Sequence, residues 1–163
     1  MLKREKPGPG QESVWDYPRP PRLEQVKETL KVVFNGEVIA ETSNALRVLE
    51  TSHPPQYYFP PEDVKTEVFT QTPRRTFCEF KGAASYWTVK VGDKLAENAV
   101  WAYETPNSGY QPLAGYFSFY AGPFDACYVG DEQVDAQAGN FYGGWITSKV
   151  VGPFKGGPGT MGW

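Results

Sequence analysis

Turn-forming residues recur so closely along this chain that they leave no room for a long helix. Asn-Gly, Gly-Asp and paired prolines occur at Asn35-Gly36, Pro54-Pro55, Pro60-Pro61, Gly92-Asp93 and Gly130-Asp131. Proline breaks the hydrogen bonding of a helix, and glycine supplies the backbone angles that tight turns need. The 163 residues include 17 glycines and 15 prolines, and no stretch shows sustained helical spacing of apolar side chains. We therefore expect a mainly β fold, a single compact antiparallel domain with short helical turns.

The clearest hairpin joins residues 30–34 to residues 38–41 through Asn35-Gly36, because Asn-Gly suits a type I′ turn. Residues 44–50 form either a strand or a short helix, since their period is ambiguous. Residues 60–64 predict a single helical turn that begins with proline. Further strands are expected at residues 57–59, 76–81, 86–91, 100–104, 116–120 and 126–129.

The N-terminal part differs in composition from the rest of the chain. We expect residues 1–11 to be a flexible N-terminal lead segment. We expect residues 12–29 to form an extended, proline-rich strap that packs on a β domain of residues 30–163. Trp15 and Tyr17 are two residues apart, so both rings can fall on one side of an extended chain. Large rings favour packing on the domain, although a proline-rich segment with arginines can also be a ligand for another protein.

Charge and cysteine content limit the partners of the chain. A net charge of −3 argues against nucleic acid, and no apolar run approaches the length of a membrane span. The first residues lack the apolar core of a signal peptide, so we expect a cytoplasmic protein, monomeric or homodimeric. Cys78 and Cys127 can form a disulfide only if their strands meet.

The stretch of residues 78–87 places an acid, a base and two large rings within ten residues. We expect two strands joined by a turn of small residues, so that alternation puts Glu79 and Lys81 on one face. Trp101 and Tyr103 share a face in the same way. Glu79 and Lys81 either pair in solvent, where an ion pair contributes little, or line a cleft.

A second group of polar residues includes His53, the one histidine of the chain, with Glu50 and Arg47 nearby. Arginine can hold a carboxylate or phosphate through two hydrogen bonds, and histidine can move a proton near neutral pH. The alternative is that His53 has a structural part in the turn before Pro54.

Several kinds of chemistry find no support in the sequence. A structural zinc site usually has paired Cys-x-x-Cys ligands, which two isolated cysteines and one histidine do not supply. There is no phosphate-binding Walker loop and no Gly-x-Gly-x-x-Gly after a strand, and the glycine-rich residues 152–160 predict a loop. We expect neither a metal nor a cofactor.

Several runs of residues in order carry a resemblance to a known family. They are residues 13–21, 49–55, 57–60, 81–87, 113–116, 141–147 and 162–163. With these runs, the chain resembles the domain-of-unknown-function family numbered 427 over nearly its whole length. The resemblance implies a compact, mostly β domain with a topology similar to the β-tent folds of the methionine sulfoxide reductase B type. Many β-tent relatives hold zinc with Cys-x-x-Cys pairs, which this sequence lacks.

Two functions fit these observations. The first is binding of a small molecule, with or without catalysis, in an aromatic-lined pocket with Glu, Lys and Arg as its polar groups. A catalytic form would use Glu50 or Glu79 as general base and Lys81 to stabilise negative charge. Residues that would bind the ligand are Arg47, His53, Tyr58, Tyr86, Trp87, Trp101, Tyr103 and Tyr116. The alternative is a non-enzymatic module that binds another protein through its aromatic surface and the N-terminal strap.

Overall fold

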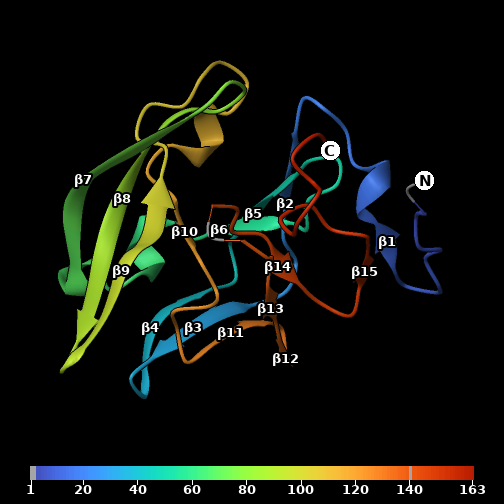
Figure 1. Ribbon diagram of the computed structural model, residues 1–163. Coiled ribbons are helices and arrows are strands. Elements are labelled where there is room, and N and C mark those ends of the chain that lie inside the picture. The colour runs from blue at the N-terminus through green and yellow to red at the C-terminus, as the bar shows by residue number, and fades with distance from the viewer. Residues whose placement is uncertain (1–2, 140) are drawn as a thin grey trace.

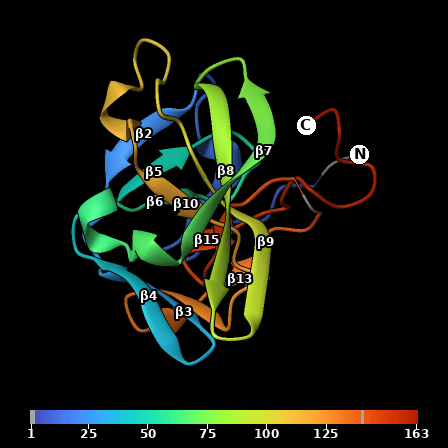
Figure 2. The ribbon, with the colours of Figure 1, turned by 90° about the vertical axis from the view of Figure 1, so that its left-hand side faces the viewer.

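The computed structural model describes residues 3–139 and 141–163. Its largest element is a twisted antiparallel sheet that forms one side of the molecule (Figures 1 and 2). Figure 2 views this sheet from its outer side, with the two long hairpins in front. In order across the sheet, its strands are β10 (Phe117–Phe119), β9 (Lys94–Ala102), β8 (Gly82–Val91) and β7 (Phe69–Cys78).

A second antiparallel sheet lies at the lower end of the molecule in Figure 1. It contains β12 (Glu132–Gln133), β11 (Ala126–Val129), β3 (Leu30–Phe34) and β4 (Glu37–Thr42). The turn between β3 and β4 has positive φ at both Asn35 (49°) and Gly36 (76°), as a type I′ turn requires. The predicted hairpin is therefore confirmed.

A third sheet joins the N-terminal part of the chain to the long sheet. It contains β2 (Arg22–Gln25), β5 (Leu46–Leu49) and β6 (Gln56–Tyr58), all antiparallel. Phe59, directly after β6, exchanges two main-chain hydrogen bonds with Phe117 of β10, at 2.8 and 2.9 Å. The segment whose period left strand and helix open is thus a strand.

The N- and C-terminal segments form two short strand pairs of their own beside the three larger sheets. β1 (Glu12–Ser13) pairs in parallel with β15 (Val150–Val151), and β13 (Asp135–Ala136) pairs with β14 (Trp145–Ile146). The 3₁₀ helices of the described residues are η1 (Val14–Asp16), η2 (Pro61–Asp63), η3 (Thr66–Val68) and η4 (Gln111–Leu113). η2 confirms the predicted helical turn. η1 corrects the extended conformation expected there, because the Ser13 hydroxyl accepts a hydrogen bond from the Trp15 main chain and begins a helical turn.

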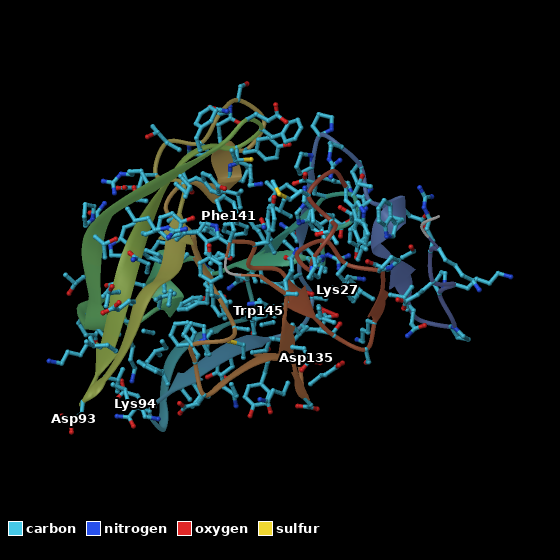
Figure 3. All side chains as sticks on the ribbon, in the orientation of Figure 1. Lys27, Asp93, Lys94, Asp135, Phe141 and Trp145 are labelled. Carbon is cyan, nitrogen blue, oxygen red and sulfur yellow. The ribbon has the colours of Figure 1, made fainter. Side chains whose placement is uncertain are left out.

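The core is divided between the two faces of the joined sheets. Side chains of a strand alternate between faces, so Tyr57 packs in a large cluster around Trp145, and Tyr58 in a second cluster around Trp101. In β9, Val100 belongs to the first cluster and Trp101 to the second. Trp145, labelled near the centre of Figure 3, is 1 % exposed, and its indole N–H donates to the Phe119 carbonyl at 2.8 Å. The mainly β, antiparallel fold is confirmed.

Candidate functional site

The turn between β7 and β8 is the first wall of a pocket, and its position corrects one prediction. Cys78 lies opposite Gly82 in the ladder, so the turn is formed by residues 79–81 and not by the small residues 82–85. Gly82 adopts a φ of +107°, which favours glycine. The Asn107 main chain donates to the Lys81 carbonyl at 2.9 Å and fixes the turn. Glu79 and Lys81 therefore leave the strand, and strand alternation does not place them on one face.

A second turn, residues 50–53, forms the opposite wall. The His53 main-chain N–H donates to the Glu50 carbonyl at 3.0 Å, and Ser52 between them has a φ of +73°. Both ends of the chain hold this turn in place, because Ser52 N–H donates to the Val14 carbonyl and Lys155 N–H donates to the Ser52 carbonyl. Polar residues of distant segments thus meet at one point.

Gln137 determines which nitrogen of His53 carries the proton. Its side-chain oxygen accepts from the Gly144 N–H at 2.9 Å, so its NH₂ group is the part that faces Lys155 and His53. That group donates to the Lys155 carbonyl at 2.6 Å and lies 3.3 Å from His53 Nδ1. Nδ1 is then an acceptor without a proton, and the proton of the imidazole is on Nε2. Nε2 faces the Glu50 carboxylate at 3.8 Å.

Burial, with the cations around it, keeps His53 neutral. Burial lowers the pKa of the imidazole to about 3, and the positive charges of Lys155, Arg19 and Lys81 act in the same direction. His53 is 5 % exposed. Because the imidazole is neutral, its contact with Glu50 is not an ion pair. The cation that pairs with Glu50 is Arg19, whose Nε lies 3.2 Å from the carboxylate.

Lys81 is the most unusual side chain of the site. It is 3 % exposed, yet within residues 3–139 and 141–163 its ammonium group has no carboxylate and no hydrogen-bond acceptor as partner. The Nζ atom lies 5.8 Å from the centre of the Tyr103 ring. Lys155 is half-buried and donates to the main-chain oxygen of Trp163 at 3.3 Å, with its Nζ 5.3 Å from the centre of the Tyr142 ring.

These groups line a pocket of about 540 Å³. Its lining residues are Arg19, Glu50, His53, Gln56, Phe77, Cys78, Glu79, Phe80, Lys81, Tyr103, Phe141, Tyr142, Lys155 and Trp163. Phe141, labelled in Figure 3, lies between the upper part of the long sheet and the C-terminal segment, far from Asp93 and Lys94 at the tip of the β8–β9 hairpin. The structure thus brings together five residues predicted from the sequence: Glu50, His53, Glu79, Lys81 and Tyr103.

Four of the predicted aromatic residues lie in the protein beside the pocket and do not line it. Tyr58 and Trp101 are buried and joined by a 3.3 Å hydrogen bond from the indole N–H to the phenol oxygen. Tyr86 is buried in the same cluster, and Tyr116 packs half-buried against it. Tyr58 contacts two lining residues of the pocket: its phenol oxygen is 3.4 Å from the side-chain oxygen of Gln56, and its ring centre is 6.4 Å from that of Tyr103.

The remaining two predicted residues lie elsewhere. Arg47 Nη2 binds Glu24 at 2.8 Å and Glu12 at 3.2 Å on the sheet of β2 and β5, where it has its own carboxylates. Burial lowers the pKa of the guanidinium, but these hydrogen bonds raise it above its usual value. Trp87 is on the opposite face of the long sheet, with its ring 5.1 Å from that of Phe117.

Reasoning from the sequence missed nine lining residues of the pocket and also Gln137, which contacts His53. Arg19, Cys78 and Tyr142 carried a signal. Arg19 and Tyr142 lie in the runs of residues that the family resemblance rests on, and Cys78 opens the aromatic stretch. Lys155 is within the glycine-rich loop, where nothing in the local sequence points to a pocket.

Comparison with known protein families gives a match. A family model described as "Domain of unknown function (DUF427)" matches residues 22–130. The chain belongs to the DUF427 family. Comparison with curated proteins gives no match. Glu50, His53 and Lys81 lie inside the matched DUF427 range, whereas Arg19 and Lys155 come from segments on either side of it.

Two further observations concern the whole described chain. Within residues 3–139 and 141–163, no group of three or more His, Cys, Asp or Glu side chains could hold a metal ion. None of the described helices of this DUF427 protein is long and apolar enough to cross a membrane.

Proposed function

We propose that this DUF427 protein binds a small molecule in the pocket between the β7–β8 turn and the turn of residues 50–53. The observation that carries the proposal is Lys81, which is 3 % exposed and whose ammonium group, at the pocket wall, has no counter-ion among the described residues. Burying a charge without a partner lowers stability, so such a group is expected where a ligand supplies the missing partner.

The size and lining of the pocket support the same proposal. Pockets for small molecules typically measure about 300–1,000 Å³ and combine many apolar and aromatic walls with a few polar groups. At about 540 Å³, this pocket is lined by six rings, from Phe77, Phe80, Tyr103, Phe141, Tyr142 and Trp163. Its polar groups converge from both ends of the chain.

The proposal includes a catalytic form, in which each polar group has a defined part. His53 donates a hydrogen bond from Nε2 and does not act as a base, because Nδ1 already accepts from Gln137 and the pKa is low. Proton abstraction falls to Glu50, or to the exposed Glu79 at the pocket wall. Lys81 stabilises negative charge that develops on the substrate.

The test is a screen of metabolites by thermal unfolding, with the wild type and a Lys81→Met variant side by side. Methionine keeps the length of the side chain and removes the charge, so we expect the empty variant to be more stable by about 1 kcal/mol and to lose every ligand response. Lys90→Met, at an exposed position of β8, is the matched control and should keep both properties. If Lys81→Met unfolds readily, Lys81 has a structural role and the proposal is wrong.

An interaction with another protein is the second candidate, and one observation favours it. Phe77 is 73 % exposed and Phe141 is 50 % exposed, both at the pocket. The strap contributes less, because Tyr17 is buried and Trp15 packs against Trp163. For a homodimer formed through this face, Phe77→Ser should abolish dimers in sedimentation velocity. A protein that is monomeric at high concentration contradicts that form.

Location in the cytoplasm remains part of the proposal. Both cysteines are free thiols, Cys78 half-buried and Cys127 buried, which is usual in a reducing compartment.

A further inference from the structure

We propose that the ligand is an anion, a carboxylate or phosphate group attached to a flat ring, and that Lys81 and Lys155 bind its charge. This inference rests on the proposed function, because it names the chemical class of ligand for the same pocket. It follows from the balance of charges, from the hydrogen-bond donors that face the pocket and from the rings beside the two lysines.

The charges of the pocket do not cancel. Arg19 and Glu50 neutralise each other through a 3.2 Å contact. Glu79 is exposed and, among the described residues, makes no ion pair with either lysine. Among the described residues, Lys81 then has no carboxylate partner, and Lys155 makes no ion pair with an Asp or Glu side chain and donates to the Trp163 main-chain oxygen at 3.3 Å. An anionic ligand supplies the missing charge.

The donors of the pocket also suit an anion. His53 has its N–H at Nε2, because Gln137 occupies Nδ1, and this N–H lies 3.8 Å from the Glu50 carboxylate, too far for a hydrogen bond. The imidazole keeps this single orientation of donor and acceptor at neutral pH, since Gln137 is itself fixed by Gly144 and Lys155. A carboxylate or phosphate oxygen accepts from such a donor and from both ammonium groups.

Each of the two ammonium groups lies against a ring from a different segment. Lys81 Nζ is 5.8 Å from the centre of Tyr103, and Lys155 Nζ is 5.3 Å from the centre of Tyr142. A ring face attracts a cation and holds it in place while no anion is bound. The same rings offer flat apolar surface, so a ligand that joins an anionic group to a ring uses both properties.

The experiment measures binding of four small probes by isothermal titration calorimetry. Phenyl phosphate and benzoate carry the proposed chemistry, benzamide is the neutral match and benzylamine the cationic one. We expect the two anions to bind more tightly than benzamide, to weaken with added salt and to lose about 10- to 100-fold in affinity in Lys81→Met and in Lys155→Met. Inorganic phosphate distinguishes a free phosphate site from one that needs the ring. Lys90→Met should bind all probes as the wild type does.

The outcomes separate this inference from the proposed function. If benzamide or benzylamine binds as well as benzoate, the anion inference is overturned and small-molecule binding stands. If anions bind equally to Lys81→Met and the wild type, they bind elsewhere and the inference is wrong. If no probe binds and removal of the Lys81 charge leaves thermal stability unchanged, the inference and the proposed function both fail.

Discussion

The single histidine makes the electrostatics of the pocket measurable through protein stability. His53 is buried with a pKa near 3, while an unfolded histidine titrates near its ordinary value of about 6.5. The unfolded state therefore binds a proton more strongly than the folded state. The stability that His53 contributes is fully present above pH 6.5 and is lost as pH falls from 6.5 toward 3.

The size of the effect follows from linkage. Below pH 6.5, each pH unit removes about 1.4 kcal/mol, so the free energy of unfolding should fall by about 2 kcal/mol between pH 7 and pH 5. For a chain of 163 residues this corresponds to a drop of about 4–8 °C in melting temperature. Carboxyl groups ordinarily titrate near pH 4, so they contribute little in this window.

The assay is urea unfolding at pH 7, 6 and 5 for the wild type and for His53→Gln. Glutamine retains a donor and an acceptor but does not titrate, so the variant should lose little stability across this range. The quantity to compare between the two proteins is the change in the free energy of unfolding from pH 7 to pH 5, and not its value at pH 7. Equal losses in both proteins would refute the reasoning, because another group would then be responsible for the dependence.

Three further predictions concern stability and reactivity. A Cβ at Gly143 would lie 2.2 Å from the Trp101 ring, so Gly143→Ala should lower the free energy of unfolding, measured with urea, by about 3 kcal/mol. Gly122 is in open space, so Gly122→Ala should change the free energy of unfolding by less than about 1 kcal/mol. The buried Ser52 hydroxyl has no hydrogen-bond partner in the part of the chain described, so Ser52→Ala should raise the free energy of unfolding by about 1 kcal/mol. A clear decrease in the free energy of unfolding would show that the hydroxyl has a partner. A thiol reagent should modify only Cys78 in the native protein and should modify Cys127 as well after unfolding, because Cys127 is buried. Rapid modification of both cysteines in the native protein would contradict the burial of Cys127.

The parts of the fold that sequence predicts well are those whose cause is local. Asn35-Gly36 needs no distant contact to favour its turn, and the hairpin was predicted correctly. The turn after Cys78 was misplaced because Ala84 and Ser85 look like turn residues. They are small for another reason: Ala84 packs in the Trp101 cluster, and Ser85 donates to Glu104 at 2.7 Å.

The same distinction holds for the site. Glu50, His53 and Lys81 were predicted from their own surroundings in the sequence, and they line one pocket. Arg47 was expected to bind a ligand, but β2 places Glu24 opposite it, which is a consequence of strand pairing that no local pattern reveals. Lys155 joins the pocket through contacts with residues about a hundred positions away, so no spacing rule identifies it.

The hydrogen bond from Lys155 to Ser52 has a consequence for how the protein matures. During synthesis, the turn of residues 50–53 emerges well before Gln137, Tyr142 and Lys155, which complete its surroundings. A nascent chain can build its first sheets and still lack a complete pocket. If the pocket binds a ligand as proposed, binding requires the chain up to Lys155, and a chain shortened before Lys155 should fold in large part yet bind nothing.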